Sequence, residues 1–390
     1  MARVSQSKRT SVTRDLLSVW GAVADGVTPK TTQDRTKYWN HWVKYTSLFG
    51  CNPFLPESVP PLERDNIVLA FAARVRTGVY GRGTQVKVPT VTDALSAISQ
   101  TIQLASDRSP LYRGEQKYNL PIERMVEGYR RRDSPSIPQL AVPIIVPNAC
   151  FEAGCLSNNP KQEAAGCLVI IAFYYLLRVG EYTKPRMATR NGQRVRATRT
   201  KQFTYSNVGF FKNGKVVSRN LPLNLLLSCN SAMLKITNQK NGRMGDTIHQ
   251  KCTGTDNCPV RALVIRINHL NIHKGNEDDR LLCDVYHNDV WHSIQSNNII
   301  KFFRTAAKLL KLNEQGIDPD LIGVHSLYAG GAMALRLHGF DDTIITMKMG
   351  RWTSLTFLQY IHTQIAHLSE DISKKMSIPL PFLNITSINA

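Results

Sequence analysis

The chain has 390 residues, 42% of them hydrophobic and 20% charged, which describes an ordinary globular protein with room for two domains. Its 49 Lys and Arg residues outnumber its 29 Asp and Glu residues, so the net charge is +20. A basic excess of this size predicts a polyanionic partner. The longest apolar run, Cys167 to Leu177, is too short to span a bilayer, so no membrane partner is expected.

The basic excess is not confined to one part of the chain. Residues 1–137 hold 20 basic and 12 acidic side chains, and the remainder holds 29 and 17. We therefore expect both parts to contact the polyanion. The eight cysteines are scattered and the first residues are polar, so reduced thiols, no secretion signal and an intracellular protein are expected.

The first part of the chain is predicted to be a compact helical domain. Residues 1–14 are polar and basic and are expected to form a disordered arm. Residues 15–132 carry apolar side chains at helical spacing, most clearly over Lys37–Phe49, Asn66–Val75, Val91–Leu104 and Pro121–Tyr129. Residues 133–140, with two prolines and small polar residues, are predicted to be a linker.

A second domain is predicted over residues 141–368, with a tail at 369–390. It opens with a long, largely buried helix over Lys161–Tyr182. Two Asn-Gly turns then predict β-hairpins over Phe210–Val217 and Leu234–Ile248. Helices are expected again over Val260–His269, Asn297–Leu312, Ser326–Leu337, Asp341–Met347 and Leu355–Leu368. The predicted fold class is mainly α with a small antiparallel sheet.

The last quarter of the chain carries three motifs in close succession. His-Ser-Leu-Tyr-Ala-Gly-Gly-Ala begins at His325, Gly-Arg-Trp begins at Gly350, and Tyr360 follows within a predicted helix. This order resembles the catalytic C-terminus of the tyrosine recombinases. The amino-acid sequences of these motifs, together with Cys-Pro-Val-x-Ala-Leu from Cys258, are most similar to those of recombinases of eukaryotic mobile elements, the Crypton and DIRS-like group.

The resemblance implies a helical core-binding domain followed by an α+β catalytic domain. It also implies a site-specific recombinase or integrase that cleaves and rejoins DNA through a 3′-phosphotyrosyl intermediate, with no metal and no other cofactor. Tyr360 would be the nucleophile. By itself one of 13 tyrosines is more often a core or surface residue, and the Gly-Arg-Trp turn raises the functional interpretation above that alternative.

The remaining catalytic roles follow from the same resemblance. Arg178 matches the first arginine of the family and would grip a phosphate bidentately while Glu181 orients it; a simple salt bridge between the two is the structural alternative. Lys240, at a predicted hairpin tip, would protonate the leaving 5′-hydroxyl, with Lys235 as runner-up. His325 would be the general base or a phosphate hydrogen-bond donor. Trp352 would donate its indole N–H to a phosphate oxygen, or anchor the tyrosine helix.

Tyr328 is a departure from the family pattern. Where the family has His-x-x-Arg, this chain has His325 followed three residues later by Tyr328. A phenol can donate a hydrogen bond but cannot neutralise the charge that develops on phosphorus. We therefore expect impaired activity, and the alternative function is a catalytically inactive, recombinase-derived DNA-binding protein.

A strongly basic stretch precedes the predicted sheet. From Arg186 to Arg219 the chain has nine Lys and Arg and no Asp or Glu, interleaved with aromatic residues, which is typical of a DNA-backbone surface. The candidate DNA contacts are Arg186, Arg190, Arg194, Arg196, Arg199, Lys201, Lys212, Lys215, Arg219, Arg243 and Arg351.

One rival arrangement would bind metal. His249, Cys252, Cys258, His269 and His273 follow one another in a loosely zinc-like order. The gap between the two cysteines is unusual and His269 falls within a predicted helix, so we expect no metal site.

The expected partners are double-stranded DNA and further copies of the chain. The family resemblance implies a tetramer on synapsed DNA sites and, for a eukaryotic transposon or other mobile element, a nuclear location. The tail at 369–390 contains an apolar cluster that we expect to dock on a neighbouring protomer, with docking on its own domain as the alternative.

Overall fold

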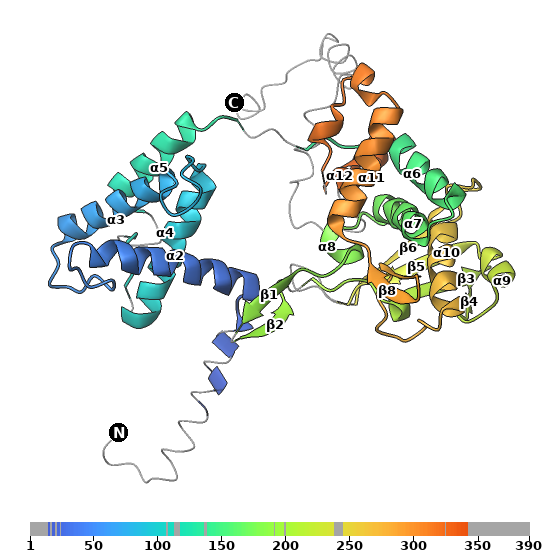
Figure 1. Ribbon diagram of the computed structural model, residues 1–390, viewed down its shortest axis with the longest axis horizontal. Coiled ribbons are helices and arrows are strands. Elements are labelled where there is room, and N and C mark those ends of the chain that lie inside the picture. Colours follow the sequence, from blue (N-terminus) through green and yellow to red (C-terminus); the bar gives the residue numbers. More distant parts are fainter. Residues whose placement is uncertain are drawn as a thin grey trace, which may run out of the picture. The chain divides into compact units, whose positions relative to one another are not determined.

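The computed structural model describes residues 25–341 together with 15, 18–19 and 22–23, except for gaps at 107, 113–117, 136–138, 191, 199, 238–244 and 324. The chain divides into two compact units (Figure 1). Unit 1 combines Met1–Ser136 with Arg186–Arg199, and unit 2 combines Ile137–Pro185 with Thr200–Ala390. The chain first passes from unit 1 to unit 2 between residues 136 and 137, within the range predicted to be a linker. The segment Arg186–Arg199 differs from the predicted boundaries, because it clusters with unit 1.

Unit 1 is built from helices that pack around one aromatic and aliphatic core. The helices are α2 (Pro29–Ser47), α3 (Pro61–Arg76), α4 (Val88–Ser106) and α5 (Leu120–Arg132), which confirms the four predicted helical stretches. Trp42 is fully buried, lies edge-on to Phe71 and donates its indole N–H to the Pro53 carbonyl oxygen at 2.7 Å. Burying an indole with its N–H satisfied lets the ring contribute its full apolar area.

A short hairpin from the middle of the chain completes unit 1. Strands β1 (Met187–Arg190) and β2 (Gln193–Arg196) pair antiparallel, and β1 packs beside α2 (Figure 1). The Lys30 N–H, in the first turn of α2, donates to the Ala197 carbonyl oxygen at 3.2 Å. N–H groups in the first turn of a helix have no partner inside the helix, so this bond satisfies a donor that the helix leaves open.

Unit 2 is a helical layer with small antiparallel sheets. Its helices are α6 (Ile145–Leu156), α7 (Pro160–Tyr174), α8 (Val179–Tyr182), α9 (Leu223–Leu227), α10 (Pro259–Ile272), α11 (Ser296–Leu309) and α12 (Ser326–Leu337). The four-stranded sheet has the order β4 (Lys215–Val217), β3 (Val208–Lys212), β5 (Ser231–Lys235) and β6 (Thr247–Lys251). Strands β7 (Asp284–His287) and β8 (Val290–Ser293) form a separate pair. Single 3₁₀ turns occupy Tyr205–Asn207, Leu312–Gln315 and Pro319–Leu321. The predicted fold class, mainly α with small antiparallel sheets, is confirmed.

The hairpin predicted over Phe210–Val217 is present in the sheet, and the strands of the second predicted hairpin are paired, with its Asn-Gly turn outside the described residues. Asn213 and Gly214 adopt φ of 51° and 79° between β3 and β4, the left-handed pair that a tight hairpin turn requires. β5 and β6 also pair antiparallel. The predicted helices over Val260–His269, Asn297–Leu312 and Ser326–Leu337 correspond to α10, α11 and α12. Residues 342–368, which include the last two predicted helices, lie outside the described residues.

The predicted single helix over Lys161–Tyr182 is wrong. α7 ends at Tyr174, Leu176 adopts a left-handed φ of 47°, and the short α8 begins only at Val179. The Leu177 N–H then reaches back to the Ala172 carbonyl oxygen at 2.9 Å and closes the turn. The break reorients the backbone just before Arg178. No helix within the described residues is long and apolar enough to cross a membrane.

Two consecutive glycines allow α12 to lie directly on α7. A Cβ atom at Gly330 would collide with the Val142 carbonyl oxygen, and one at Gly331 would collide with the Phe173 carbonyl oxygen and the Leu176 side chain. The backbones therefore approach more closely than any side chain would permit. This contact brings the start of α12 beside the turn that carries Arg178.

Candidate active site

Arg178 lies at the N-terminal cap of α8, where its backbone and that of Glu181 are tied together. The Arg178 N–H donates to Glu181 Oε2 at 2.9 Å, and the Glu181 N–H donates to the Arg178 carbonyl oxygen at 2.8 Å. The Arg178 Nη1 lies 3.6 Å from Glu181 Oε1. The Glu181 side chain is only 3% exposed, so its charge acts in a region of reduced dielectric. The salt bridge considered from sequence is therefore present, and the orienting role of Glu181 stays a prediction that is compatible with it.

The short helix α8 is held in place from two sides. Gln202 Nε2 donates to the Gly180 carbonyl oxygen at 2.9 Å, and the Phe203 N–H donates to the Glu181 carbonyl oxygen at 2.8 Å. On the other side, the Lys184 N–H donates to the Ile294 carbonyl oxygen at 2.8 Å. A four-residue helix has little stability of its own, so these bonds define its position.

The guanidinium of Arg178 faces the ring of Tyr328. The Arg178 Cζ lies 5.5 Å from the centroid of the Tyr328 ring, within the range of a cation–π contact. Tyr328 is 3% exposed. The Arg178 Nη1 is buried and makes no hydrogen bond to any described residue. A buried donor without an acceptor costs roughly 1–3 kcal/mol, and a phosphate oxygen would supply that acceptor.

His325 is the residue that caps the start of α12, one turn before Tyr328. Its backbone N–H donates to Gln139 Oε1 at 3.1 Å, and its carbonyl oxygen accepts from the Ala329 N–H at 2.9 Å. The Ser326 hydroxyl accepts from the Gly323 N–H at 2.9 Å and fixes the turn. His325 is exposed, whereas Tyr328, three residues further on, is buried.

The other predicted catalytic residues are Lys240, Trp352 and Tyr360. They lie outside the described residues, as do Arg243 and Arg351. Lys235 is exposed at the end of β5, shortly before the segment that contains Lys240. The structure therefore brings Arg178, Glu181 and Tyr328 together and leaves the roles of the others as predictions.

Most of the described candidate DNA contacts are exposed. Arg186, Arg194 and Arg196 are exposed on the hairpin of unit 1, and Lys201, Lys212 and Lys215 are exposed in unit 2. Arg190 belongs to β1, but its side chain is not among those described, and Arg199 lies outside the described residues. The basic stretch that looks continuous in the sequence is therefore divided between the two units.

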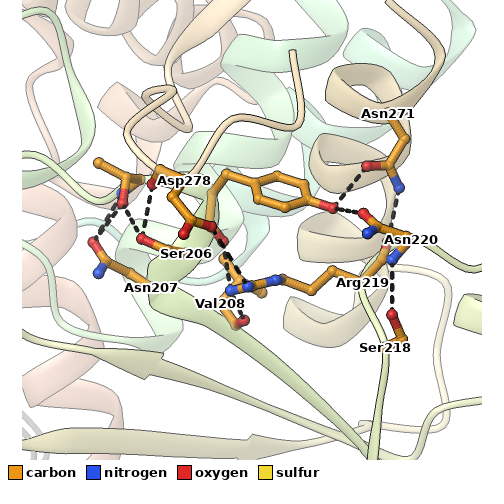
Figure 2. A network of polar contacts seen from close by, with 10 residues as sticks. Ser206, Asn207, Val208, Ser218, Arg219, Asn220, Asn271 and Asp278 are labelled. Carbon is orange, nitrogen blue, oxygen red and sulfur yellow. Dashed lines mark hydrogen bonds and ion pairs between the residues drawn. The ribbon is translucent and has the colours of Figure 1, made fainter. Parts of the chain in front are cut away.

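Arg219 differs from the other candidates because its guanidinium is used inside unit 2 (Figure 2). Its Nη1 donates to the carbonyl oxygens of Tyr205 and Val208 at 3.1 and 3.0 Å, and its Cζ lies 5.0 Å from the Tyr205 ring centroid. Asn271 closes the network by accepting from the Tyr205 hydroxyl at 2.9 Å and donating to the Arg219 carbonyl oxygen at 2.8 Å. A DNA contact by Arg219 stays a prediction, but these bonds give it a structural role.

The residues of the zinc-like alternative have other contacts. Among the described residues, no three His, Cys, Asp or Glu side chains are grouped so that they could hold a metal ion. His269 Nε2 accepts from the Tyr286 N–H at 3.0 Å. Burial, with the neighbouring Arg266 and His273 charges, lowers the pKa of His269 to about 3. A neutral imidazole used as a backbone acceptor explains this histidine without a metal.

Comparison with known proteins gives matches only among solved structures. No protein-family model and no curated protein matches the chain. The XerH site-specific recombinase bound to palindromic difH substrate, in a post-cleavage complex, is 14% identical, with 80% of this chain and 72% of that chain covered and a TM-score of 0.45. The Tn1549 transposon integrase in complex with transposon right end DNA is 9% identical, with 87% and 98% covered and a TM-score of 0.42. The XerA recombinase is 13% identical, with 90% and 100% covered and a TM-score of 0.35. None of the three TM-scores reaches 0.5, so the functional conclusion rests on the residues of the chain itself.

Proposed function

We propose that this chain is a tyrosine-type site-specific DNA recombinase or integrase whose activity is impaired by Tyr328. The observation that carries the proposal is the contact between Arg178 and Tyr328. Two motifs that lie 150 positions apart in the sequence meet here: the Arg178 Cζ lies 5.5 Å from the Tyr328 ring centroid, and the Arg178 Nη1 lies 3.6 Å from Glu181 Oε1. Position 328 is where the family resemblance places a second phosphate-binding arginine.

In the proposed reaction the Tyr360 oxygen attacks phosphorus and the 5′-oxygen of the next nucleotide leaves. The phosphodiester is exchanged for a phosphotyrosyl ester, so a free 5′-hydroxyl can reverse the step and join a new strand. Arg178 donates from its buried Nη1 to a non-bridging oxygen and offsets the charge that develops there. His325 removes the proton of Tyr360 or donates to the phosphate, and Lys240 protonates the leaving oxygen.

Tyr328 limits this chemistry because it is neutral. Its hydroxyl can donate one hydrogen bond, whereas an arginine would bring a second positive charge and a planar pair of donors. Loss of one preorganised donor in an oxyanion site costs on the order of 10²–10³ in rate. Slow cleavage is therefore the expected behaviour of this chain.

The proposal extends to partners and location. The net charge of +20 and the exposed arginines and lysines of both units fit duplex DNA. A homotetramer on synapsed sites, an origin in a eukaryotic mobile element and a nuclear location are proposed from the motif resemblance. The alternative function, a DNA-binding protein without catalysis, is favoured by one observation, the missing charge at Tyr328.

Trapping of the covalent intermediate tests the proposal. Nicked duplexes with a randomised central region lose a short fragment after cleavage, so an adduct cannot be reversed. Incubation with the chain, denaturation and capture of protein-linked DNA should give a small yield of labelled adduct, and sequencing that DNA would identify the site. Tyr360→Phe should give none.

The same assay separates the two functions. Duplex binding without adduct, both for the native chain and for Tyr328→Arg, would reject the recombinase and support the DNA-binding protein. An adduct that persists in Tyr360→Phe would show that another residue is the nucleophile.

A further inference from the structure

Two cysteines of unit 2 meet where β6 passes into α10. Cys252 directly follows the last residue of β6, and Cys258 is the N-cap residue of α10. The Cys252 N–H donates to the Asn230 carbonyl oxygen at 2.9 Å. The Cys258 carbonyl oxygen accepts the Ala262 N–H, also at 2.9 Å. The strand and the helix therefore hold both ends of the short loop 253–257, and the two thiols hydrogen-bond to one another.

The environment of Cys258 favours a thiolate. The residue is 4% exposed. Burial raises the pKa of its thiol, but hydrogen bonds to its sulfur outweigh burial, so that the pKa is lowered overall. The donors are the backbone N–H groups of Arg261, Thr253 and Val260 and the Cys252 thiol. Because the thiolate is the reactive form of cysteine, Cys258 is the sulfur that we expect to react first.

Cys252 is placed to act as the partner thiol. The residue is exposed, and its Sγ donates to the Cys229 carbonyl oxygen at 3.2 Å. Desolvation of this sulfur, together with the charge of Cys258, raises the pKa of Cys252 to about 11, so it is a protonated thiol near neutral pH. A thiolate with a second thiol beside it is the arrangement in which oxidation stops at a disulfide.

We propose that Cys252 and Cys258 form a reversible redox site, in which hydrogen peroxide converts the two thiols to a disulfide between β6 and α10. This inference goes beyond the proposed function and does not depend on it, because the chemistry needs only the two thiols and the peroxide. A disulfide of this kind is regulatory rather than structural in a compartment that keeps thiols reduced.

The reaction has two steps. The Cys258 thiolate attacks one peroxide oxygen, the O–O bond breaks and hydroxide leaves, which gives a sulfenic acid. The Cys252 sulfur then attacks the sulfenic sulfur, the S–O bond breaks, and the thiol proton leaves with the oxygen as water. The first hydroxide takes up the proton that Cys258 had given to solvent. The two thiols thus lose two electrons and two protons, and the peroxide becomes two waters. Exchange with a dithiol restores both thiols.

The redox pair adjoins the end of α7. Gln250 Nε2, on β6, donates to the Tyr174 carbonyl oxygen at 2.6 Å. The Tyr175 hydroxyl donates to the Ala232 carbonyl oxygen of β5 at 3.0 Å. These bonds tie the sheet to the end of α7, so a disulfide from Cys252 would join α10 to the same framework.

The test is peptide mapping of the full chain after treatment with hydrogen peroxide and alkylation of the remaining thiols. Trypsin cleaves after Lys251 and Arg261, so both cysteines fall in the single peptide Cys252–Arg261. This peptide should lose two hydrogens and escape alkylation, and dithiothreitol should restore both alkylation sites. Cys155, the other exposed cysteine, has a pKa raised by burial, so the disulfide should form on the order of tenfold faster than Cys155 is oxidised. Oxidation of Cys155 at the same rate would overturn the proposal.

Serine variants separate the roles of the two thiols. Cys252→Ser and Cys258→Ser should each abolish the loss of two hydrogens, whereas Cys155→Ser, the matched control, should leave it unchanged. In Cys252→Ser the sulfenic acid of Cys258 has no thiol to react with, so dimedone should label Cys258. Labelling of Cys252 in Cys258→Ser to the same extent would reject Cys258 as the first sulfur to react.

Two further outcomes would reject the redox site. If peroxide adds oxygen to the peptide Cys252–Arg261 of the native chain and forms no disulfide, the two thiols do not act as a pair. If the peptide resists alkylation before peroxide is added and a chelator removes that resistance, the thiols bind a metal ion instead.

Discussion

At the scale of single residues, the proposed chemistry depends on position 328. Tyr328 is buried against Arg178, at the place where the family resemblance puts a second guanidinium. Tyr328→Arg should raise the rate of adduct formation on the order of 10²–10³, because two arginines would then share the charge that develops on the phosphate. Adduct yield over time on a suicide substrate measures this effect.

In the protein without DNA, the same substitution should lower the stability of the fold. With no phosphate present, two guanidinium groups would lie close together beside the Glu181 carboxylate, which already pairs with Arg178. We therefore expect Tyr328→Arg to be less stable to urea than the native chain and to regain stability when DNA is added. Combined with Tyr360→Phe, it should give no adduct. An adduct rate unchanged by Tyr328→Arg would show that position 328 does not face the phosphate.

At the scale of secondary-structure elements, the approach of α12 to α7 sets the geometry of the site. Gly331 lies against the Phe173 carbonyl oxygen and the Leu176 side chain, just ahead of Arg178. Gly331→Ala must push the helices apart, so unit 2 should lose about 1–3 kcal/mol of unfolding free energy. Adduct yield should fall as well, because Tyr328 would move away from Arg178. Urea unfolding followed by circular dichroism measures the first effect.

Gly128→Ala is the matched control for this prediction. Gly128 lies within α5 and has nothing within 4 Å of the position that its Cβ would take. The same substitution should there stabilise unit 1 by about 0.5–1 kcal/mol, since alanine favours the helix. If Gly331→Ala were equally stabilising, the close approach of α12 and α7 would be wrong.

Local signals predicted these elements well, and long-range packing explains the differences. The turn at Asn213 and Gly214 requires left-handed backbone, which Asn-Gly favours, so the hairpin was predictable. The end of α7 was not predictable, because none of Tyr174, Tyr175 and Leu176 is a helix-breaking residue type. We attribute the break to packing. The hairpin of β1 and β2 had its own Asn-Gly signal at positions 191 and 192, which sequence reasoning missed.

In the candidate site, too, the motifs could be recognised from sequence, whereas contacts between distant segments could not. The motifs at Arg178 and His325 were recognisable from sequence, and so was the pairing of Arg178 with Glu181. The contact between Arg178 and Tyr328 was not, because it depends on α12 lying on α7. Arg219 was indistinguishable from its exposed neighbours in the sequence, and only the fold shows that its guanidinium binds Tyr205 and Val208.

At the scale of the whole molecule, the chain passes between its two units three times, at 136–137, 185–186 and 199–200. The segment from Arg178 through α8 to the hairpin therefore links the proposed phosphate clamp of unit 2 to the β1–β2 hairpin of unit 1. A basic excess in both parts of the sequence predicts that both units contact a polyanion.

The last prediction concerns assembly, and it falls on a tail that lies outside the described residues. Residues 369–375 are polar and charged, whereas the end of the chain gathers six large apolar residues: Ile378, Leu380, Phe382, Leu383, Ile385 and Ile388. An apolar cluster of this density needs a surface to cover it. We propose that a neighbouring protomer provides that surface, which would couple Tyr360 of one protomer to the assembly of the next.

Truncation after Lys375 tests the tail. The shortened chain should still bind a single DNA site, because the basic residues of both units remain, but it should not form the higher-order complexes that we propose for the full chain on paired sites. Light scattering of the protein–DNA complexes measures this difference. The matched variant replaces Phe382 and Leu383 by serine and keeps the length of the chain, so it separates loss of the apolar contact from loss of length. Complexes of unchanged size in both variants would place the tail on its own protomer and reject its role as the link.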